Sequence, residues 1–307
     1  MCKSMTLFLA LAAAALALPP AESSSPAVHL GPEPSMAGVL LISDQEDGVS
    51  EPLYFDDYYE DAIDDIFGHP YYYNILYHTR DIRVQDLTGH GAVVWYTGIS
   101  GGTSSADGPA GHITLTLDEE DAVIQYLETT PADECRGVWL CGMYIAWNCI
   151  AEVLTMGQLY SELFSNYVGL DYPTGNFLDP IRVDSSWIGG SGSSSPPLSG
   201  VPYSIWWAPG DYNYPDMLGT SGSAWSALTW QDSGGATHHS SVIANQGSSP
   251  YGGTWYIVLS ALPLESVGTE SSGEERSYMM SDVLSWFQVT VGVEESSWGQ
   301  IKASYAP

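Results

Sequence analysis

Short uninterrupted apolar runs recur along the chain, and segments with a helical spacing of apolar residues lie between them. An apolar run without alternation predicts a strand that is covered on both faces, as in a parallel sheet. The runs with this pattern are residues 38–44, 74–77, 91–98, 137–142 and 255–259. Strands that alternate with helices in this way indicate an α/β fold with right-handed crossovers.

Amphipathic spacing predicts the position of two helices. In residues 54–67, apolar side chains recur at every fourth position in two adjacent rows, and Gly68 is well placed to end the helix. The opposite face of this helix carries the acids Asp56, Asp57, Glu60, Asp61, Asp64 and Asp65. A similar apolar spacing predicts a helix over residues 156–168.

Capping boxes predict two further helices. Thr116 and Glu119 have the spacing in which each side chain satisfies the other residue's backbone N–H, so we expect a helix over residues 118–128. Ser272 and Glu275 have the same spacing ahead of the last apolar segment, where we expect the final helix.

The composition of the chain changes after Asp171. Gly, Ser and Pro dominate residues 184–200, and short strand-like runs follow at 203–207, 224–230 and 241–244. Such runs are typical of antiparallel edge strands joined by long loops. We therefore predict a doubly wound, mostly parallel sheet with helices on both faces and an antiparallel, loop-rich C-terminal half.

The first residues have the layout of an export signal. Lys3 precedes an apolar run that is too short to span a membrane, and cleavage after Ala17 and cleavage after Ala21 both fit the small residues that follow. We predict a signal peptide over residues 1–21, a Ser/Pro-rich linker over 22–36, one α/β domain over 37–291 and a tail over 292–307. The protein is then exported, to the cell surface, the extracellular space or the periplasm.

The charge of the chain limits its partners. It has 37 acidic and 7 basic residues, for a net charge of −30, which disfavours nucleic acid and anionic membranes and attracts cations. No later apolar stretch is long enough to span a bilayer. Hydrophobic residues make up 44% of the chain, which is enough for one large core. The chain as a whole is therefore not a disordered acidic segment.

Three cysteines follow the predicted signal peptide: Cys135, Cys141 and Cys149. Export permits a disulfide, and an odd number leaves at least one thiol free. A Cys135–Cys149 bridge leaves Cys141 available for chemistry, whereas a Cys135–Cys141 bridge removes it. The sequence leaves both pairings open.

The order of these elements resembles the class I glutamine amidotransferase-like, flavodoxin-like α/β domain of exported bacterial proteins. The segments that carry the resemblance are residues 38–44, 93–98, 117–127, 138–142 and 255–265. The resemblance implies a nucleophile at Cys141, at the end of a strand. It also implies that Pro263 and Glu265 match the family's late His-Pro-Glu-like group.

The chain departs from that family at the residues that catalysis needs. Active members place the cysteine in a G-x-C-x-G turn, but Trp139 and Met143 stand at the two glycine positions here. Residues 259–265 contain no histidine. Without a base, a thiol with a pKa near 8.5 is mostly protonated at neutral pH, so the resemblance implies a degenerate triad.

Other residues provide alternative chemistry. His238 or His239 could serve Cys141 as a base in a cysteine hydrolase. The two histidines cannot bind one metal ion together, because neighbouring residues on a strand point to opposite faces of the sheet. Asp44, Glu46 and Asp47 precede a glycine, as in a calcium loop, but Phe55 stands where that loop places its last acid.

We therefore expect an exported, non-catalytic structural or interaction module that needs no cofactor and has a protein or glycan partner at the cell exterior. Aromatic segments such as residues 71–73 and 206–207 could stack on sugars. The alternatives are a peptidase- or amidase-like hydrolase that uses Cys141, and a calcium- or glycan-binding surface protein.

Overall fold

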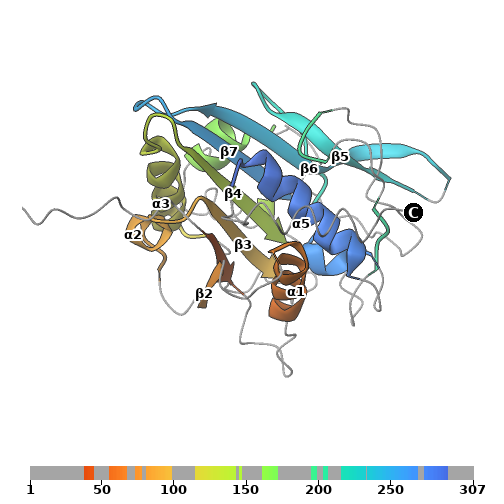
Figure 1. Ribbon diagram of the computed structural model, residues 1–307. Coiled ribbons are helices and arrows are strands. Elements are labelled where there is room, and N and C mark those ends of the chain that lie inside the picture. The colour runs from red at the N-terminus through yellow and green to blue at the C-terminus, as the bar shows by residue number, and fades with distance from the viewer. Residues whose placement is uncertain are drawn as a thin grey trace, which may run out of the picture. The chain divides into compact units, whose positions relative to one another are not determined.

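The computed structural model describes residues 38–44, 55–67, 73–77, 81–98, 115–142, 145–146, 161–171, 195–198, 203–206, 216–232, 234–268 and 273–289. All of them belong to one compact unit. They build a seven-stranded sheet in the order β2-β1-β3-β4-β7-β6-β5 (Figure 1). The predicted signal peptide, linker and tail lie outside the described residues. None of the described helices is long and apolar enough to cross a membrane.

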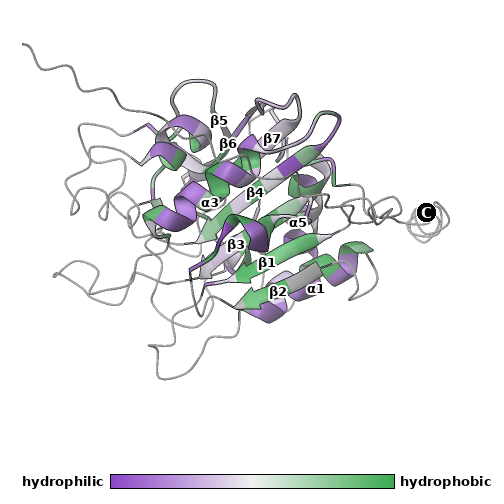
Figure 2. Ribbon diagram, turned by 90° about the vertical axis from the view of Figure 1, so that its left-hand side faces the viewer, coloured by the Kyte–Doolittle hydropathy of each residue, from purple (hydrophilic) through white to green (hydrophobic). Residues whose placement is uncertain are grey.

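Five strands of this sheet run parallel, as predicted from the apolar runs. They are β1 (Val39–Ser43), β2 (Tyr73–Tyr77), β3 (Ala92–Gly98), β4 (Cys135–Gly142) and β7 (Thr254–Ser260). Every residue of β1 is buried, which explains why its sequence has no alternation between apolar and polar positions. Figure 2 shows β1 as hydrophobic, whereas α1 and α3 alternate between hydrophilic and hydrophobic residues.

The C-terminal part of the sheet is antiparallel, which confirms the predicted fold class. β5 (Trp225–Gln231) pairs with β6 (Thr237–Ser248), and β6 pairs with β7, both antiparallel. β6 is 12 residues long, much longer than the predicted strand at 241–244. Its first three residues are exposed and polar, so an apolar pattern marks only its centre.

Helices cover both faces because the crossovers run in opposite directions. The connection from β1 to β2 through α1 (Asp56–Phe67) moves one way along the sheet, and that from β3 to β4 through α3 (Leu117–Glu128) moves the other way. Right-handed crossovers then place the two helices on opposite faces. The last helix, α5 (Glu274–Trp286), packs against α1, and the short α2 (Val84–Leu87) packs against α3.

The last helix meets the sheet at a glycine. A Cβ atom at Gly137 in β4 would lie only 2.1 Å from the ring of Phe287, which caps the C-terminal end of α5. Glycine at this position therefore lets the aromatic ring pack directly on the strand backbone.

The predicted capping box of α3 is confirmed. The Glu119 N–H donates to Oγ1 of Thr116 at 3.3 Å, and the Thr116 N–H donates to Oε2 of Glu119 at 2.9 Å. Glu119 is fully buried and also accepts a hydrogen bond from the Ile82 N–H at 2.9 Å. Its carboxylate thus joins the start of α3 to the segment before α2.

Three other local predictions differ from the structure. Glu275 does not cap α5, because its carboxylate accepts the Ser204 N–H at 2.6 Å, and Ser272 lies outside the described residues. Of the predicted helix 156–168, residues 161–168 are described, and Leu163–Val168 form a π-helix, η1. The predicted strand 203–207 is described only as a single bridge between Ile205 and Val267.

Candidate functional site

Cys141 lies near the carboxyl end of β4, between two parallel neighbours. Its backbone is level with Tyr96 on β3 and with Ser260 on β7. The carboxyl ends of parallel strands are where α/β proteins gather their ligands and catalytic groups. The position of this cysteine is therefore the one in which a nucleophile is expected.

The thiol of Cys141 is buried, with helix α1 on one side and the segment after β7 on another. The side chain of Cys141 is 0% exposed, and so is that of Tyr59, whose hydroxyl oxygen lies 3.4 Å from Sγ. The ring of Tyr59 stacks on Tyr96 with centroids 3.8 Å apart and planes 11° from parallel. The thiol also faces the carbonyl oxygen of Leu262 at 3.8 Å. The tyrosine ring thus closes the site from the side of α1.

Tyr59 also connects the cysteine with Glu265. Its hydroxyl donates to Oε2 of Glu265 at 2.8 Å, from the short helix η2 (Leu264–Ser266) that follows β7. A phenol has one proton, and the shorter contact assigns that proton to the carboxylate. Oε1 of Glu265 has no hydrogen-bond partner among the described residues. The structure thus brings Cys141 and Glu265 to one site, with a tyrosine between them.

Burial controls the protonation of this cluster. Removal from water raises the pKa of Cys141 to about 12, and the nearby Glu265 carboxylate adds to the rise. Burial also raises the pKa of Glu265 to about 7, against the opposing effects of its own backbone N–H, the Tyr59 hydrogen bond and the Arg276 charge. The pKa of Tyr59 is raised for the same reason. At neutral pH the thiol and the phenol are both uncharged.

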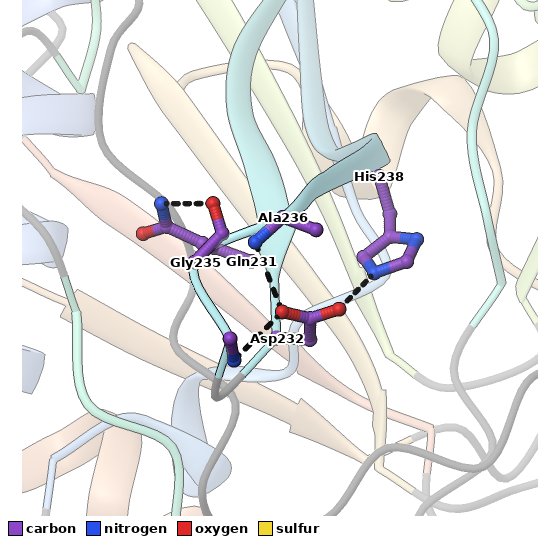
Figure 3. A network of polar contacts seen from close by, with 6 residues as sticks. Gln231, Asp232, Gly235, Ala236 and His238 are labelled. Carbon is purple, nitrogen blue, oxygen red and sulfur yellow. Dashed lines mark hydrogen bonds and ion pairs between the residues drawn. The ribbon is translucent and has the colours of Figure 1, made fainter.

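The two predicted histidine bases lie elsewhere. His238 is near the start of β6, and its Nε2 pairs with Oδ2 of Asp232 at 3.0 Å (Figure 3). Asp232 also accepts the backbone N–H groups of Gly234 and Ala236, so it organises the turn between β5 and β6. These contacts give the His238–Asp232 pair a role in the hairpin.

The strand register gives the distance from this hairpin to the thiol. Val242 of β6 is level with Ser260, which is level with Cys141 two strands away. His238 lies four residues before Val242, so strand geometry places its Cα about 16 Å from that of Cys141. A general base must lie about 3 Å from the group that it deprotonates. Neither His238 nor its exposed neighbour His239 meets this condition.

The predicted calcium ligands are only partly described. Asp44 follows β1, and its Oδ2 accepts the indole N–H of Trp95 at 3.1 Å. Glu46 and Asp47 lie outside the described residues. In the part of the chain that the structure describes, no group of three or more His, Cys, Asp or Glu side chains could hold a metal ion.

The register of β4 also separates two of the cysteines. Cys135 and Cys141 lie six residues apart on one strand, so their Cα atoms are about 20 Å apart. A disulfide needs Cα atoms within about 7 Å, which excludes the Cys135–Cys141 pairing. Both cysteines are free, and Cys135 Sγ donates to Oε1 of Gln288 at 3.5 Å. Cys149 lies outside the described residues.

The sequence interpretation missed the role of Tyr59. Its place in the inner row of α1 marked it as a core residue, which is correct, because it is fully buried. The available signal was chemical: a buried tyrosine hydroxyl needs a hydrogen-bond partner. The sequence offers no means of choosing that partner, because Glu265 is 206 residues away in the chain.

Comparisons with known proteins show only distant similarity. No family model matches the chain, and no curated protein matches it. Among solved structures, it is similar to a putative GMP synthase subunit from Thermoplasma acidophilum, at 11% identity and a TM-score of 0.44, over 87% of this chain and 98% of that one.

Two cytoplasmic proteins from Salmonella typhimurium are similar at the same level. One has 12% identity and a TM-score of 0.42 over 81% of this chain and 98% of its own. The other has 9% identity and a TM-score of 0.40 over 83% and 97%. These values assign the chain to no family.

Proposed function

We propose that this chain is an exported, non-catalytic α/β domain of the class I glutamine amidotransferase-like type, which acts as a structural or interaction module at the cell exterior. One observation carries the proposal. The cysteine that occupies the nucleophile position is sealed under Tyr59, and that tyrosine, in place of a histidine, joins it to Glu265.

A phenol in this position does not replace an imidazole. A base must accept the thiol proton, and the transfer from Cys141, with a pKa of about 12, to Glu265, with a pKa of about 7, is unfavourable even where the phenol relays the proton. With a pKa of about 12 for Cys141, the thiolate fraction at pH 7 is on the order of 10⁻⁵. The thiol also lacks the solvent access that a substrate would need.

The hydrolase alternative requires the hairpin histidines to reach Cys141. His238 is held by Asp232 at a turn, about 16 Å from the cysteine along the sheet. To bring them together, the start of β6 would have to leave its pairing with β5, in which Ser240 is level with Thr229 and Thr237 with Gln231. The observed geometry therefore favours the non-catalytic function.

Thiol labelling with site mapping tests the proposal. The intact protein is treated with a water-soluble maleimide at pH 7.4, and the modified cysteines are identified by peptide mass spectrometry. We expect the partly exposed Cys135 to be labelled and Cys141 to be labelled only after unfolding in urea. Rapid labelling of Cys141 in the folded protein, absent from a Cys141→Ala variant, would argue for a working nucleophile.

A further inference from the structure

An open hollow of about 560 Å³ lies beside the π-helix η1, away from the Cys141 cluster. Its lining residues are Ser161, Glu162, Ser165, Asn166, Leu170, Asp171 and Ser221. A volume in this range suits a small organic ligand. The hollow is thus large enough for a molecule with several heavy atoms.

The lining has a buried floor and an exposed acidic rim. Ser161 and Leu170 are each 1% exposed and form the floor, while Glu162, Asn166 and Asp171 are exposed. Among the described residues, none of these three exposed side chains forms a hydrogen bond. Two carboxylates and an amide therefore face the opening with their hydrogen-bonding capacity unused.

The three serine hydroxyl groups of the lining already donate their protons to other groups of the protein. The Ser161 hydroxyl donates to Glu120, and the Ser165 hydroxyl donates to the Ser161 carbonyl at 2.5 Å. The Ser221 hydroxyl faces the Leu170 carbonyl at 3.4 Å. A hydroxyl that donates its single proton inward presents only lone pairs to a ligand.

The backbone donors around the hollow are committed as well. The N–H groups of Leu170, Asp171 and Ser221 donate to the carbonyls of Phe164, Gly219 and Gly169, at 2.8, 3.2 and 2.8 Å. Apart from the amide NH2 of Asn166, the hollow therefore presents hydrogen-bond acceptors and two negative charges. Such a lining selects a ligand group that donates several hydrogen bonds and carries positive charge.

The hollow is rigidly held. The Tyr167 hydroxyl donates to Glu128 at 2.5 Å, and the Asn245 amide donates to the Tyr167 carbonyl at 2.7 Å, which fixes η1 to α3 and β6. An antiparallel bridge between Leu170 and Thr220 joins the two walls. Single π-helical turns occur often at functional sites, and a preformed site costs little ordering when a ligand binds.

We propose that this hollow binds an organic cation through a primary ammonium group. An ammonium offers three donors on one positive centre, which matches the acceptors and the two carboxylates. The volume exceeds what a single ion needs, and the described residues of the lining include no group of three candidate metal ligands. The source of the ammonium is a free amine or a lysine side chain of a partner. The proposal does not depend on whether Cys141 reacts.

Calorimetric titration of the intact protein at low salt tests this site. The probes are 1,5-diaminopentane, its neutral analogue 1,5-pentanediol, and lysine with blocked amino and carboxyl termini. We expect the diamine to bind at least tenfold more tightly than the diol. Tight binding of the blocked lysine identifies a side chain as the source, and binding of the diamine alone identifies a free amine. Equal binding of diol and diamine would overturn the proposal.

Matched charge variants separate the hollow from the general acidity of the protein. Glu162→Gln with Asp171→Asn should weaken diamine binding at least tenfold. Asp57→Asn with Asp121→Asn removes the same charge from exposed positions on α1 and α3, and should change binding less than twofold. An equal loss in both double variants would assign binding to diffuse attraction and refute the site. Thermal melts of each variant confirm folding, and the single variants replace a double variant that fails to fold.

Discussion

Tyr59 on helix α1 donates its hydroxyl proton to Glu265, 206 residues later in the chain, at 2.8 Å. This bond joins the first helix of the domain to the short helix η2 that follows β7. It lies at the carboxyl end of the central strand β4, where an active α/β enzyme would keep an opening for substrate. In this protein the same place is filled by an aromatic side chain and a buried carboxyl group.

Removal of the Tyr59 hydroxyl should destabilise the protein. Tyr59→Phe keeps the ring that stacks on Tyr96 but removes the hydrogen bond to Oε2 of the buried Glu265, whose Oε1 already has no partner among the described residues. We expect a loss of about 1–3 kcal/mol in the free energy of unfolding, measured by urea denaturation at pH 7.5. Tyr278→Phe is the control, because Tyr278 is 51% exposed and should cost little. Equal stabilities of the two variants would refute the role of the bond.

Glu265 should make stability fall as pH rises. Its folded pKa of about 7 lies above its ordinary value of 4.5, so between these values only the folded state keeps the proton. The contribution of this proton to the free energy of unfolding is complete below pH 4.5. It decreases by about 3 kcal/mol as the pH rises to 7. Glu265→Gln should therefore gain stability relative to the original protein as pH rises from 5 to 8 in urea denaturation. Parallel pH profiles for the two proteins would contradict the pKa assignment.

Arg136 should be essential for the packing of α3. This buried guanidinium donates to the Tyr126 carbonyl at 2.8 Å and to the Thr129 hydroxyl at 2.9 Å, at the C-terminal end of α3, and lies over the Tyr126 ring. Arg136→Met keeps the apolar stem and removes these contacts, so we expect a loss of about 2–4 kcal/mol by chemical denaturation. Arg83→Met, at an exposed position, is the control and should cost under about 1 kcal/mol.

His238 should have no influence on the cysteine. His238→Ala removes the contact to Asp232 in an exposed turn, and we expect little change in the free energy of unfolding. Maleimide labelling of Cys141 in the folded protein should be as slow as before the substitution. A change in the pH dependence of that labelling would show that the histidine reaches the thiol, and would revive the hydrolase function.

The sequence predicts the architecture well because buried strands and helix ends have recognisable patterns of neighbouring residues. The continuous apolar run of β1 and the capping box of Thr116 and Glu119 each depend on residues that are near one another in the chain. Both features are present in the structure. The polar ends of β6 show no apolar pattern from which a strand could be predicted. Their backbone groups are hydrogen-bonded to β5 and β7, and this pairing does not depend on the side chains of β6.

The candidate site is harder to predict, because its contacts cross the chain. Cys141 meets Tyr59, 82 residues before it, and no local pattern shows that this tyrosine, and not the neighbouring Tyr58, contacts the thiol. The family resemblance indicated Cys141 and Glu265 as two separate positions. Only the structure shows that the hydroxyl of Tyr59 lies between their side chains. The acceptor-lined hollow escaped prediction for the same reason, since its walls come from residues 161–171 and from Ser221.

A disulfide forms only where two sulfur atoms can meet. Cys135 and Cys141 are held at opposite ends of one strand, and α1 then covers the second of them. In the folded protein the Cys141 thiol is buried, out of reach of oxidants and of other chains. The tyrosine beside this sulfur therefore also limits unwanted crosslinks of the folded protein.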